Sequence, residues 1–212
     1  MHFESTHYKP EIFSEKVALL VTRLLKKTLN LFYGKHLAKR AMLLETIAAV
    51  PGMVAGVFNH LKALRRMKDD GGWIKELLDE ADNERMHLMI FLTVTKPSII
   101  ERILVMLLQF IFLIIYGVIY LVSSKTAHRI VGYFEEEACN SYSEYISKIE
   151  EGALPNHPAP EIAITYYRLP EGATFLDVLF RIREDEAKHR DKNHDIANLY
   201  KTKDLPEHQL QR

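Results

Sequence analysis

The chain contains few residues of the kinds that mark secreted, disordered or nucleic-acid-binding proteins. Its one cysteine, Cys139, excludes a disulfide within the chain, and we expect it to be a small buried thiol. Nine glycines and eight prolines in 212 residues do not indicate disorder. Acidic and basic residues number 28 each, so no nucleic-acid surface is indicated. We expect a single domain over residues 1–212, with flexible tails at 1–10 and 201–212.

Two Glu-x-x-His pairs are the most informative charged residues. Glu84 and His87 form one pair, and Glu186 and His189 form the other. A spacing of three residues places both side chains of a pair on one face of a helix. Each pair continues an apolar stripe, made by Leu77, Ala81, Leu88 and Phe91 in the first helix and by Leu179 and Ile182 in the second. Because a carboxylate on an apolar stripe is unfavourable unless paired or metal-bound, the pairs predict a buried metal site.

Two further carboxylates fit the same site. Glu45 is the only charged residue in a stripe of small residues, as expected of a helix packed closely over a polar site. The stripe consists of Ala38, Ala41, Glu45, Ala48, Gly52 and Gly56. Glu135 shares a helix face with His128 and Tyr142, whereas the neighbouring Glu136 lies on another face. Glu45 and Glu135 are therefore the third and fourth candidate carboxylates.

Four carboxylates and two imidazoles are the ligand set of a ferritin-like di-iron site. Such a set, with no thiolate, suits iron or manganese better than copper or structural zinc. We therefore predict an all-α protein, a ferritin-like di-iron four-helix bundle that holds two iron ions between two facing helical hairpins. Two alternatives remain at this point. The chain could be a ferritin-like di-iron oxygenase, hydroxylase or iron-handling protein, or a metal-free membrane scaffold.

Two segments outside the predicted bundle are suited to a membrane. Residues 103–122 are an apolar run long enough to cross a bilayer, with Gln109 as its only strongly polar side chain. A crossing helix would put the two Glu-x-x-His pairs on opposite sides of the membrane, so we expect it to lie in one leaflet. The segment 11–33 combines an apolar stripe with a basic face, which is typical of helices on anionic headgroups. We expect two additional membrane-attaching helices, near 11–33 and 98–122, and a monotopic protein.

The limits of the helices follow from periodicity and from turn residues. Helices are expected at residues 11–33, 36–66, 73–95, 98–122 and 126–151, then a loop at 152–160, a short helix and a last helix ending near 200. Pro51 should kink the second of these or remove one of its hydrogen bonds. Thr174 is the expected N-cap of the last helix.

Four sequence blocks within residues 35–200 resemble the alternative oxidases, which are cyanide-insensitive, membrane-bound quinol oxidases with a non-haem di-iron centre. The blocks are LET at 44–46, NERMHL at 83–88, EEEA at 135–138 and REDEAKHRD at 183–191. The resemblance implies oxidation of ubiquinol with reduction of O2 to water, without proton pumping. It also implies the iron ligands, which are the six residues already selected: Glu45, Glu84, His87, Glu135, Glu186 and His189.

Further roles near the irons follow from the same resemblance. Tyr142, one heptad beyond Glu135, matches a tyrosine that can supply an electron and a proton during cleavage of the O–O bond. Asn83, Asp185 and His128 match residues that orient the ligands through hydrogen bonds.

The implied quinol pocket contains Arg40, Leu44 and Ser141. Ser141 stands where the family commonly has threonine, but its hydroxyl remains. Tyr167 follows Tyr166 where the family usually has a tyrosine and then a tryptophan, so the role of that tryptophan is not carried over.

The implied partners are ubiquinol, O2, membrane lipid and a second copy of the chain in a homodimer, with no nucleic acid. The cysteine-bearing N-terminal extension of the plant enzymes is absent here, and no targeting sequence is recognised. A bacterial-type or trimmed member of the family is therefore expected. Its place would be the cytoplasmic face of a bacterial membrane or the matrix face of the mitochondrial inner membrane.

Overall fold

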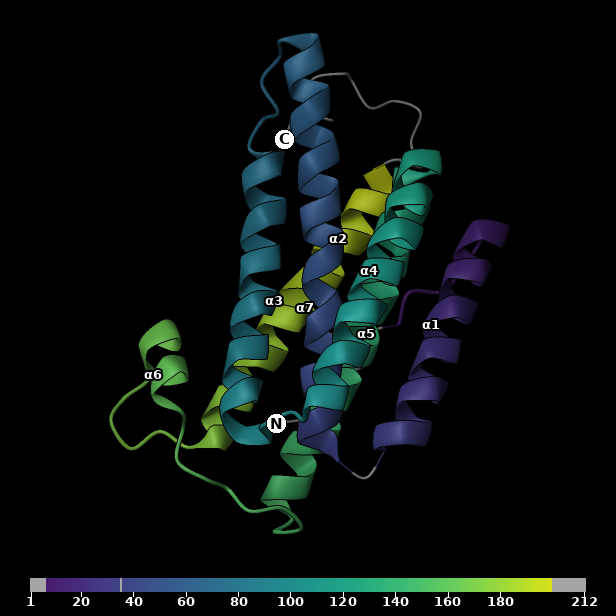
Figure 1. Ribbon diagram of the computed structural model, residues 1–212. Helices are drawn as coiled ribbons and strands as arrows, with labels where there is room; N and C mark the ends of the chain where they lie inside the picture. Colours follow the sequence, from purple (N-terminus) through teal and green to yellow (C-terminus); the bar gives the residue numbers. More distant parts are fainter. Residues whose placement is uncertain (1–6, 35, 200–212) are drawn as a thin grey trace.

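The computed structural model describes residues 7–34 and 36–199, and within them the chain forms seven α-helices (Figure 1). In chain order they are α1 (Phe13–Tyr33), α2 (Leu37–Arg66), α3 (Trp73–Thr95), α4 (Ile99–Val122), α5 (Ser124–Glu150), α6 (Glu161–Tyr167) and α7 (Phe175–Leu199). The described residues contain no strand beyond an isolated bridge between Pro158 and Thr174. The all-α prediction is confirmed, and each long helix lies within two residues of its expected limits.

Helices α2, α3, α5 and α7 form a four-helix bundle. α2 packs along α3 and α5 packs along α7, which are the two expected hairpins (Figure 1). The connection between α2 and α3 turns at Gly71 and Gly72, which have φ values of 67° and 93° that glycine adopts without strain. The segment between α5 and α7 is longer and contains α6. The expected tail residues 1–6 and 201–212 lie outside the described part of the chain.

α2 and α3 approach each other closely at Gly52. A Cβ atom at this position would lie 2.5 Å from the backbone oxygen of Leu77 and 3.0 Å from the Cβ of Ala81. One turn later, a Cβ atom at Gly56 would lie 3.0 Å from the side chain of Leu78. The stripe of small residues therefore brings the two backbones together two to three turns beyond Glu45, as its composition predicts. Pro51 lies within α2 and does not end it.

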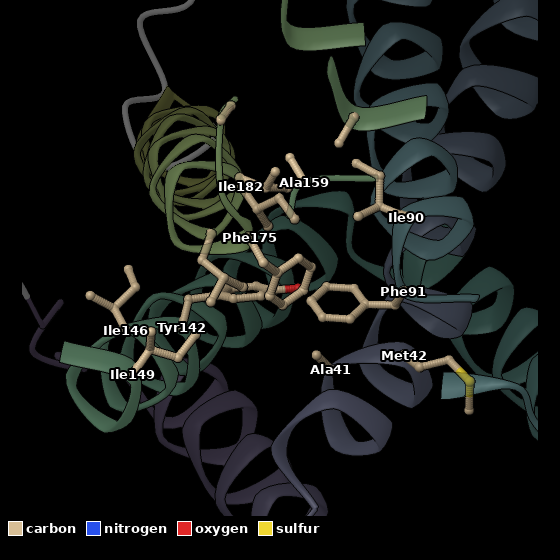
Figure 2. Close-up of a cluster of buried hydrophobic side chains, with 14 residues drawn as sticks. Ala41, Met42, Ile90, Phe91, Tyr142, Ile146, Ile149, Ala159, Phe175 and Ile182 are labelled. Carbon is tan, nitrogen blue, oxygen red and sulfur yellow. The ribbon is translucent and has the colours of Figure 1, made fainter. Parts of the chain in front are cut away.

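The largest apolar cluster connects the bundle helices beside the candidate site. Figure 2 shows Tyr142 of α5 next to the ring of Phe91 of α3, with the ring centroids 5.9 Å apart. Phe175, the first residue of α7, meets Phe91 edge to face at 6.0 Å. Such aromatic contacts have preferred geometries, so they fix the position of Tyr142 between α3 and α7.

α1 and α4 lie outside the bundle, against α2 and α5 (Figure 1). Both α2 and α4 are long and apolar enough to cross a membrane, but the apolar part of α2 is 61% buried and that of α4 only 11%. α2 is therefore a core helix, and α4 turns its apolar side chains outward. α1 does the same with Phe13, Leu24 and Leu31. The expected amphipathic character of α1 and the exposed apolar character of α4 are both present.

A buried polar network joins α3, α5 and α7. His128 of α5 donates from Nδ1 to Oδ1 of Asn193 at 2.9 Å, and Asn193 donates from Nδ2 to Glu80 Oε1 at 2.9 Å. Burial lowers the pKa of His128 to about 4 in spite of its bond to Asn193. His128 is therefore neutral in the folded protein at physiological pH.

Side-chain hydrogen bonds mark the first residues of α4, α5 and α7. The Ser98 hydroxyl accepts from the backbone N–H of Glu101 in α4, and the Ser123 hydroxyl accepts from that of Thr126. The Ser123 cap starts α5 at residue 124, two residues earlier than expected. At α7, the Asp177 carboxylate accepts from both the backbone N–H and the hydroxyl of Thr174. Thr174 was expected to cap α7 by accepting a hydrogen bond through its hydroxyl. Instead, the Thr174 hydroxyl donates to Asp177, and the Asp177 carboxylate accepts the bonds at this helix end.

Replacing Gly52 with alanine should destabilise the bundle. The added methyl group must separate α2 from the backbone of Leu77, and overpacking of this kind lowers the free energy of unfolding by about 1 to 3 kcal/mol. Gly117→Ala in α4 is the matched control, because a Cβ atom there would have no described atom within 4 Å to displace. Thermal unfolding in detergent measures both variants. Equal melting temperatures for the two would contradict close packing at Gly52.

The neutral state of His128 predicts a loss of stability in acid. Its pKa is about 4 in the folded protein and near 6.5 in the unfolded chain, so its contribution is complete above pH 6.5 and is lost as the pH falls toward 4. Between pH 6.5 and 5 the parent should lose about 2 kcal/mol more than His128→Gln. Denaturant unfolding of both proteins at the two pH values measures this difference. Identical pH dependence would show that His128 is not buried as a neutral group.

Candidate metal centre

Six buried side chains from the four bundle helices converge at the centre of the bundle. α2 supplies Glu45, α3 supplies Glu84 and His87, α5 supplies Glu135, and α7 supplies Glu186 and His189. Their ligand atoms form two groups, each within 4.8 Å: Glu45, Glu84, His87 and Glu186 in one, and Glu84, Glu135, Glu186 and His189 in the other. Glu84 and Glu186 belong to both groups. The arrangement therefore corresponds to two adjacent cation sites that share two carboxylates.

The facing atoms approach one another without forming hydrogen bonds. His87 Nδ1 lies 3.0 Å from Glu186 Oε1 and 3.5 Å from Glu45 Oε2, and His189 Nδ1 lies 2.6 Å from Glu84 Oε1. These atoms are buried, and none has an aligned hydrogen-bond partner among the described residues. Buried polar atoms are nearly always satisfied, so orphaned atoms that converge on one point are what a metal site provides.

The carboxylates of the cluster are difficult to ionise together. Burial, with the charge of Glu84, raises the pKa of Glu45 to about 7 and that of Glu135 to about 8. Burial and the neighbouring carboxylates raise the pKa of Glu186 well above its usual value. Metal cations reverse such shifts, because their positive charge favours the ionised carboxylates. The donor set and its electrostatics both fit a pair of cations.

In the protein without metal, the two imidazoles supply part of this positive charge. Burial by itself would raise the pKa of Glu84 and lower that of His189, but their mutual attraction outweighs burial in both cases. The pKa of Glu84 is held below its usual range and that of His189 rises to about 9. The pKa of His87 is also raised, because the nearby carboxylates of Asp185 and of the cluster outweigh its burial.

Tyr142 is in direct contact with the cluster. Its buried hydroxyl donates a hydrogen bond to Glu45 Oε1. Burial and the charge of Glu45 raise the pKa of Tyr142 well above its usual value, so the phenol keeps its proton. The sequence placed Tyr142 on the same helix face as Glu135, and the structure brings it against Glu45 of the facing helix.

Tyr167 and Asp185 contact the outer nitrogen of His87. The Tyr167 hydroxyl lies 2.9 Å from His87 Nε2 and donates to Asp185 Oδ2 at 3.0 Å. Asn83 donates from Nδ2 to Asp185 at 3.3 Å and to the Tyr166 hydroxyl at 2.7 Å. The structure thus brings Asn83 and Asp185 together, and Tyr167 joins them. Sequence reasoning missed Tyr167, whose only signal was that it replaces the tryptophan usual in the family.

His128 lies further from the cluster than Asp185 does. It reaches α7 through Asn193, whose side chain also donates to the backbone oxygen of His189 at 3.0 Å. Glu80, which accepts from Asn193, is a further buried carboxylate that the sequence analysis did not select. Its position one helical turn before Glu84 was the signal that could have identified it.

A cavity of about 60 Å³ opens beside the cluster between α1, α2 and α5. Arg40, Leu44 and Ser141, the three residues expected in a quinol pocket, all line it. Three cluster carboxylates, Glu45, Glu135 and Glu186, form its inner wall. The buried guanidinium of Arg40 donates to Glu144 Oε2 at 2.5 Å and to Asn30 Oδ1 at 3.2 Å. The cavity therefore connects an apolar surface, a fixed cation and the candidate metal site.

Comparisons with known proteins agree with this geometry. The sequence profile of the family described as "Alternative oxidase" matches residues 1–198. The chain is 50% identical over 194 residues to "Ubiquinol oxidase 1, mitochondrial" of Nicotiana tabacum, which covers 92% of this chain and 55% of the relative. It is 50% identical over 193 residues to "Ubiquinol oxidase, mitochondrial" of Mangifera indica, covering 91% and 61%. It is 49% identical over 192 residues to the protein of the same name from Batrachochytrium dendrobatidis, again covering 91% and 61%.

The chain spans between 55% and 61% of the length of these three relatives. The match to the family profile nevertheless extends over nearly the whole chain, and the alignment with 50% identity to the Nicotiana tabacum relative covers 92% of it. Similarity of this extent leaves one assignment: the chain belongs to the alternative oxidase family.

Proposed function

We propose that the protein is a terminal quinol oxidase that oxidises ubiquinol and reduces O2 to water at a di-iron centre. The observation that carries the proposal is the buried cluster of four carboxylates and two imidazoles, which opens on the cavity that contains Arg40. Two quinols supply the four electrons and four protons that convert one O2 to two waters. The relatives' printed name, ubiquinol oxidase, supports the choice of quinol.

Two iron ions would be held by the six residues of the cluster, with Glu84 and Glu186 shared between them. Iron fits because oxygen and imidazole ligands without thiolate suit it, and the orphaned donor atoms are already gathered. When bound, the metal pair supplies the redox chemistry that activates O2 and receives electrons from the quinol.

The protein's own groups would bind the quinol and handle its protons. The guanidinium of Arg40 is fixed by Glu144 and can donate to a quinol oxygen at the cavity wall. The Ser141 hydroxyl lines the same cavity, and Leu44 supplies apolar contact to the ring. Tyr142 holds its proton on the hydroxyl that faces Glu45 Oε1, so it can deliver a proton and an electron at the inner wall.

A second group of residues would hold the ligands in position. Asp185 and Tyr167 fix the ring of His87 through its outer nitrogen, and Asn83 fixes Asp185. His128 acts at longer range, through Asn193 and the backbone of His189. Contacts of this kind orient metal ligands and raise their basicity.

The exposed apolar side chains of α1 and α4 support a monotopic attachment to one leaflet of the membrane. α4 packs lengthwise on α2 and α5, so a crossing α4 would draw the charged bundle into the bilayer (Figure 1). A protein confined to one face has no path for protons across the membrane, which agrees with oxidation without proton pumping. The relatives' printed names describe those proteins as mitochondrial, and we propose the matrix face of the mitochondrial inner membrane for this chain.

A homodimer is the proposed assembly. The outer face of α2 carries exposed apolar side chains at regular helical spacing, namely Met53, Val57, Leu61 and Leu64. A second copy could cover this stripe without involving α1 or α4. We also propose that residues 1–212 form a single domain. A soluble ferritin-like enzyme is not favoured, because it would have no use for the exposed surface of α4.

Membranes that contain the protein should consume oxygen in the presence of cyanide when a short-chain ubiquinol is supplied. Glu84→Ala should abolish this uptake, with a loss of at least about 100-fold, because both cation sites lose a shared ligand. Glu76→Ala is the control on the same helix, since its side chain is 55% exposed and pairs with Lys192 at the surface. No uptake from an iron-loaded parent would contradict the oxidase assignment.

Removal of the metal should destabilise the parent but not the Glu84→Ala variant. A ligand present at 100 times its dissociation constant stabilises the folded state by about 2.7 kcal/mol. For a chain of this size, loss of that amount lowers the melting temperature by about 5 to 10 °C. Thermal unfolding before and after chelation, and after return of Fe²⁺, measures the effect. If the melting temperature of the parent changes neither on chelation nor on return of iron, the protein has no metal site of this kind.

A further inference from the structure

The cavity beside the cluster is too small for the ligand that the proposed function requires. Its volume is about 60 Å³, whereas an engineered protein cavity that binds a benzene molecule has a volume of about 150 Å³. A quinol ring is larger than benzene because it carries two hydroxyl groups and further substituents. At least one wall of the cavity must therefore move outward for a quinol to bind.

α1 is the wall that can move. The other walls belong to α2, α5 and α7, which carry the metal-site carboxylates and pack closely in the bundle. α1 contributes Thr22, Leu25, Lys26, Leu29 and Asn30 to the lining but none of the six cluster residues. Movement of α1 would thus open the cavity without disturbing the geometry of the metal site.

The two halves of α1 are held very differently. Its first half buries Glu15, Ala18, Leu19 and Thr22 against the bundle. In the second half, none of residues 23–31 is buried, and only Leu29 is half-buried. The part of α1 that covers the cavity is therefore the part with the least packing.

A buried ionic network anchors the first half. Glu15 Oε1 lies 3.3 Å from Nη2 of Arg129 in α5, and both side chains are almost completely buried. Arg129 also donates to Asn198 Oδ1 at 2.6 Å, contacts His194 Nδ1 at 2.8 Å and stacks over the ring of Tyr8 at 3.5 Å. Separation of a buried, multiply bonded ion pair is strongly unfavourable, so this end of α1 stays in place.

Only two polar contacts of the described residues hold the second half across the cavity mouth. Lys26 forms an ion pair with Glu137 of α5, and Asn30 accepts a hydrogen bond from Arg40 of α2 at 3.2 Å. The Lys26 and Glu137 side chains are 44% and 26% exposed. Ion pairs in contact with water contribute little to stability, so this contact can open and close readily.

We propose that residues 23–33 of α1 are a hinged cover over the cavity, with the Glu15–Arg129 network as its pivot and the Lys26–Glu137 ion pair as its latch. Opening of the latch admits a quinol between α1 and α5, and closing shields the ring from water and lipid. The identity of the ligand rests on the proposed function, whereas the hinge rests on the packing of α1.

Distances between spin labels test the hinge directly. One label replaces the exposed Lys27 on the cover, and the second replaces the exposed Glu150 on α5, in a Cys139→Ala background in lipid nanodiscs. We expect Lys26→Ala, or addition of a short-chain ubiquinone to the parent, to lengthen the Lys27–Glu150 distance and to broaden its distribution about twofold. The control pair, with labels at Lys16 and Glu150, should show no change, because Lys16 lies on the anchored half. A Lys27–Glu150 distribution that stays the same under both treatments would overturn the proposal.

Steady-state kinetics supply a second test. Lys26→Ala should change the KM for ubiquinol about two- to fivefold, as expected for loss of a partly exposed ion pair, with iron content unchanged. The charge exchange Lys26→Glu with Glu137→Lys should restore the parent's KM. A fall in kcat alone, or failure of the exchange to restore KM, would contradict the latch. If the parent oxidises no quinol, the proposed function fails, yet the distance measurement still decides whether the cover opens.

Discussion

Repulsion among four carboxylates in one dry space is the constraint on which the rest of the structure depends. Carboxylates so close together in a medium of low polarity cannot all remain ionised unless positive charge is supplied. Two imidazoles supply part of it in the protein alone, as the raised pKa of His189 indicates. A pair of metal cations would supply the remainder. The fold must therefore resist the entry of water, which would solvate these buried groups and separate its four central helices.

The packing around the site provides that resistance. Gly52 allows α2 and α3 to meet backbone to backbone two turns beyond Glu45, and the rings of Phe91, Tyr142 and Phe175 connect α3, α5 and α7 on the other side. Close contact at these positions leaves the helices little freedom to move apart. The two peripheral helices contribute no residue to these contacts, which is compatible with their proposed roles in membrane attachment and quinol access.

Local periodicity explains which parts of this arrangement could be predicted from the sequence. Apolar and small residues recur at helical spacing, and Gly71 and Gly72 mark a turn, so the helices were placed within two residues of their limits. The six cluster residues share faces with apolar neighbours, and the structure brings all six together.

Contacts between distant segments could not be predicted in this way. Tyr167 meets His87 only because the segment after α5 folds back over α3. In the sequence, nothing distinguishes Glu15 and Arg129 from surface charges. They become a buried ion pair only because α1 packs on α5.

If the proposed quinol oxidation takes place, the position of α1 at the cavity determines whether the substrate arrives from the membrane or from water. One wall of the cavity is α1, whose exposed side chains include the apolar Phe13, Leu24 and Leu31. With that side of α1 in the bilayer, a quinol would approach by lateral diffusion within a single leaflet. The effective substrate concentration is then the mole fraction of quinol among the lipids. Dilution of the membranes in buffer would leave the rate per enzyme unchanged, whereas dilution of the quinol with added phospholipid would lower it.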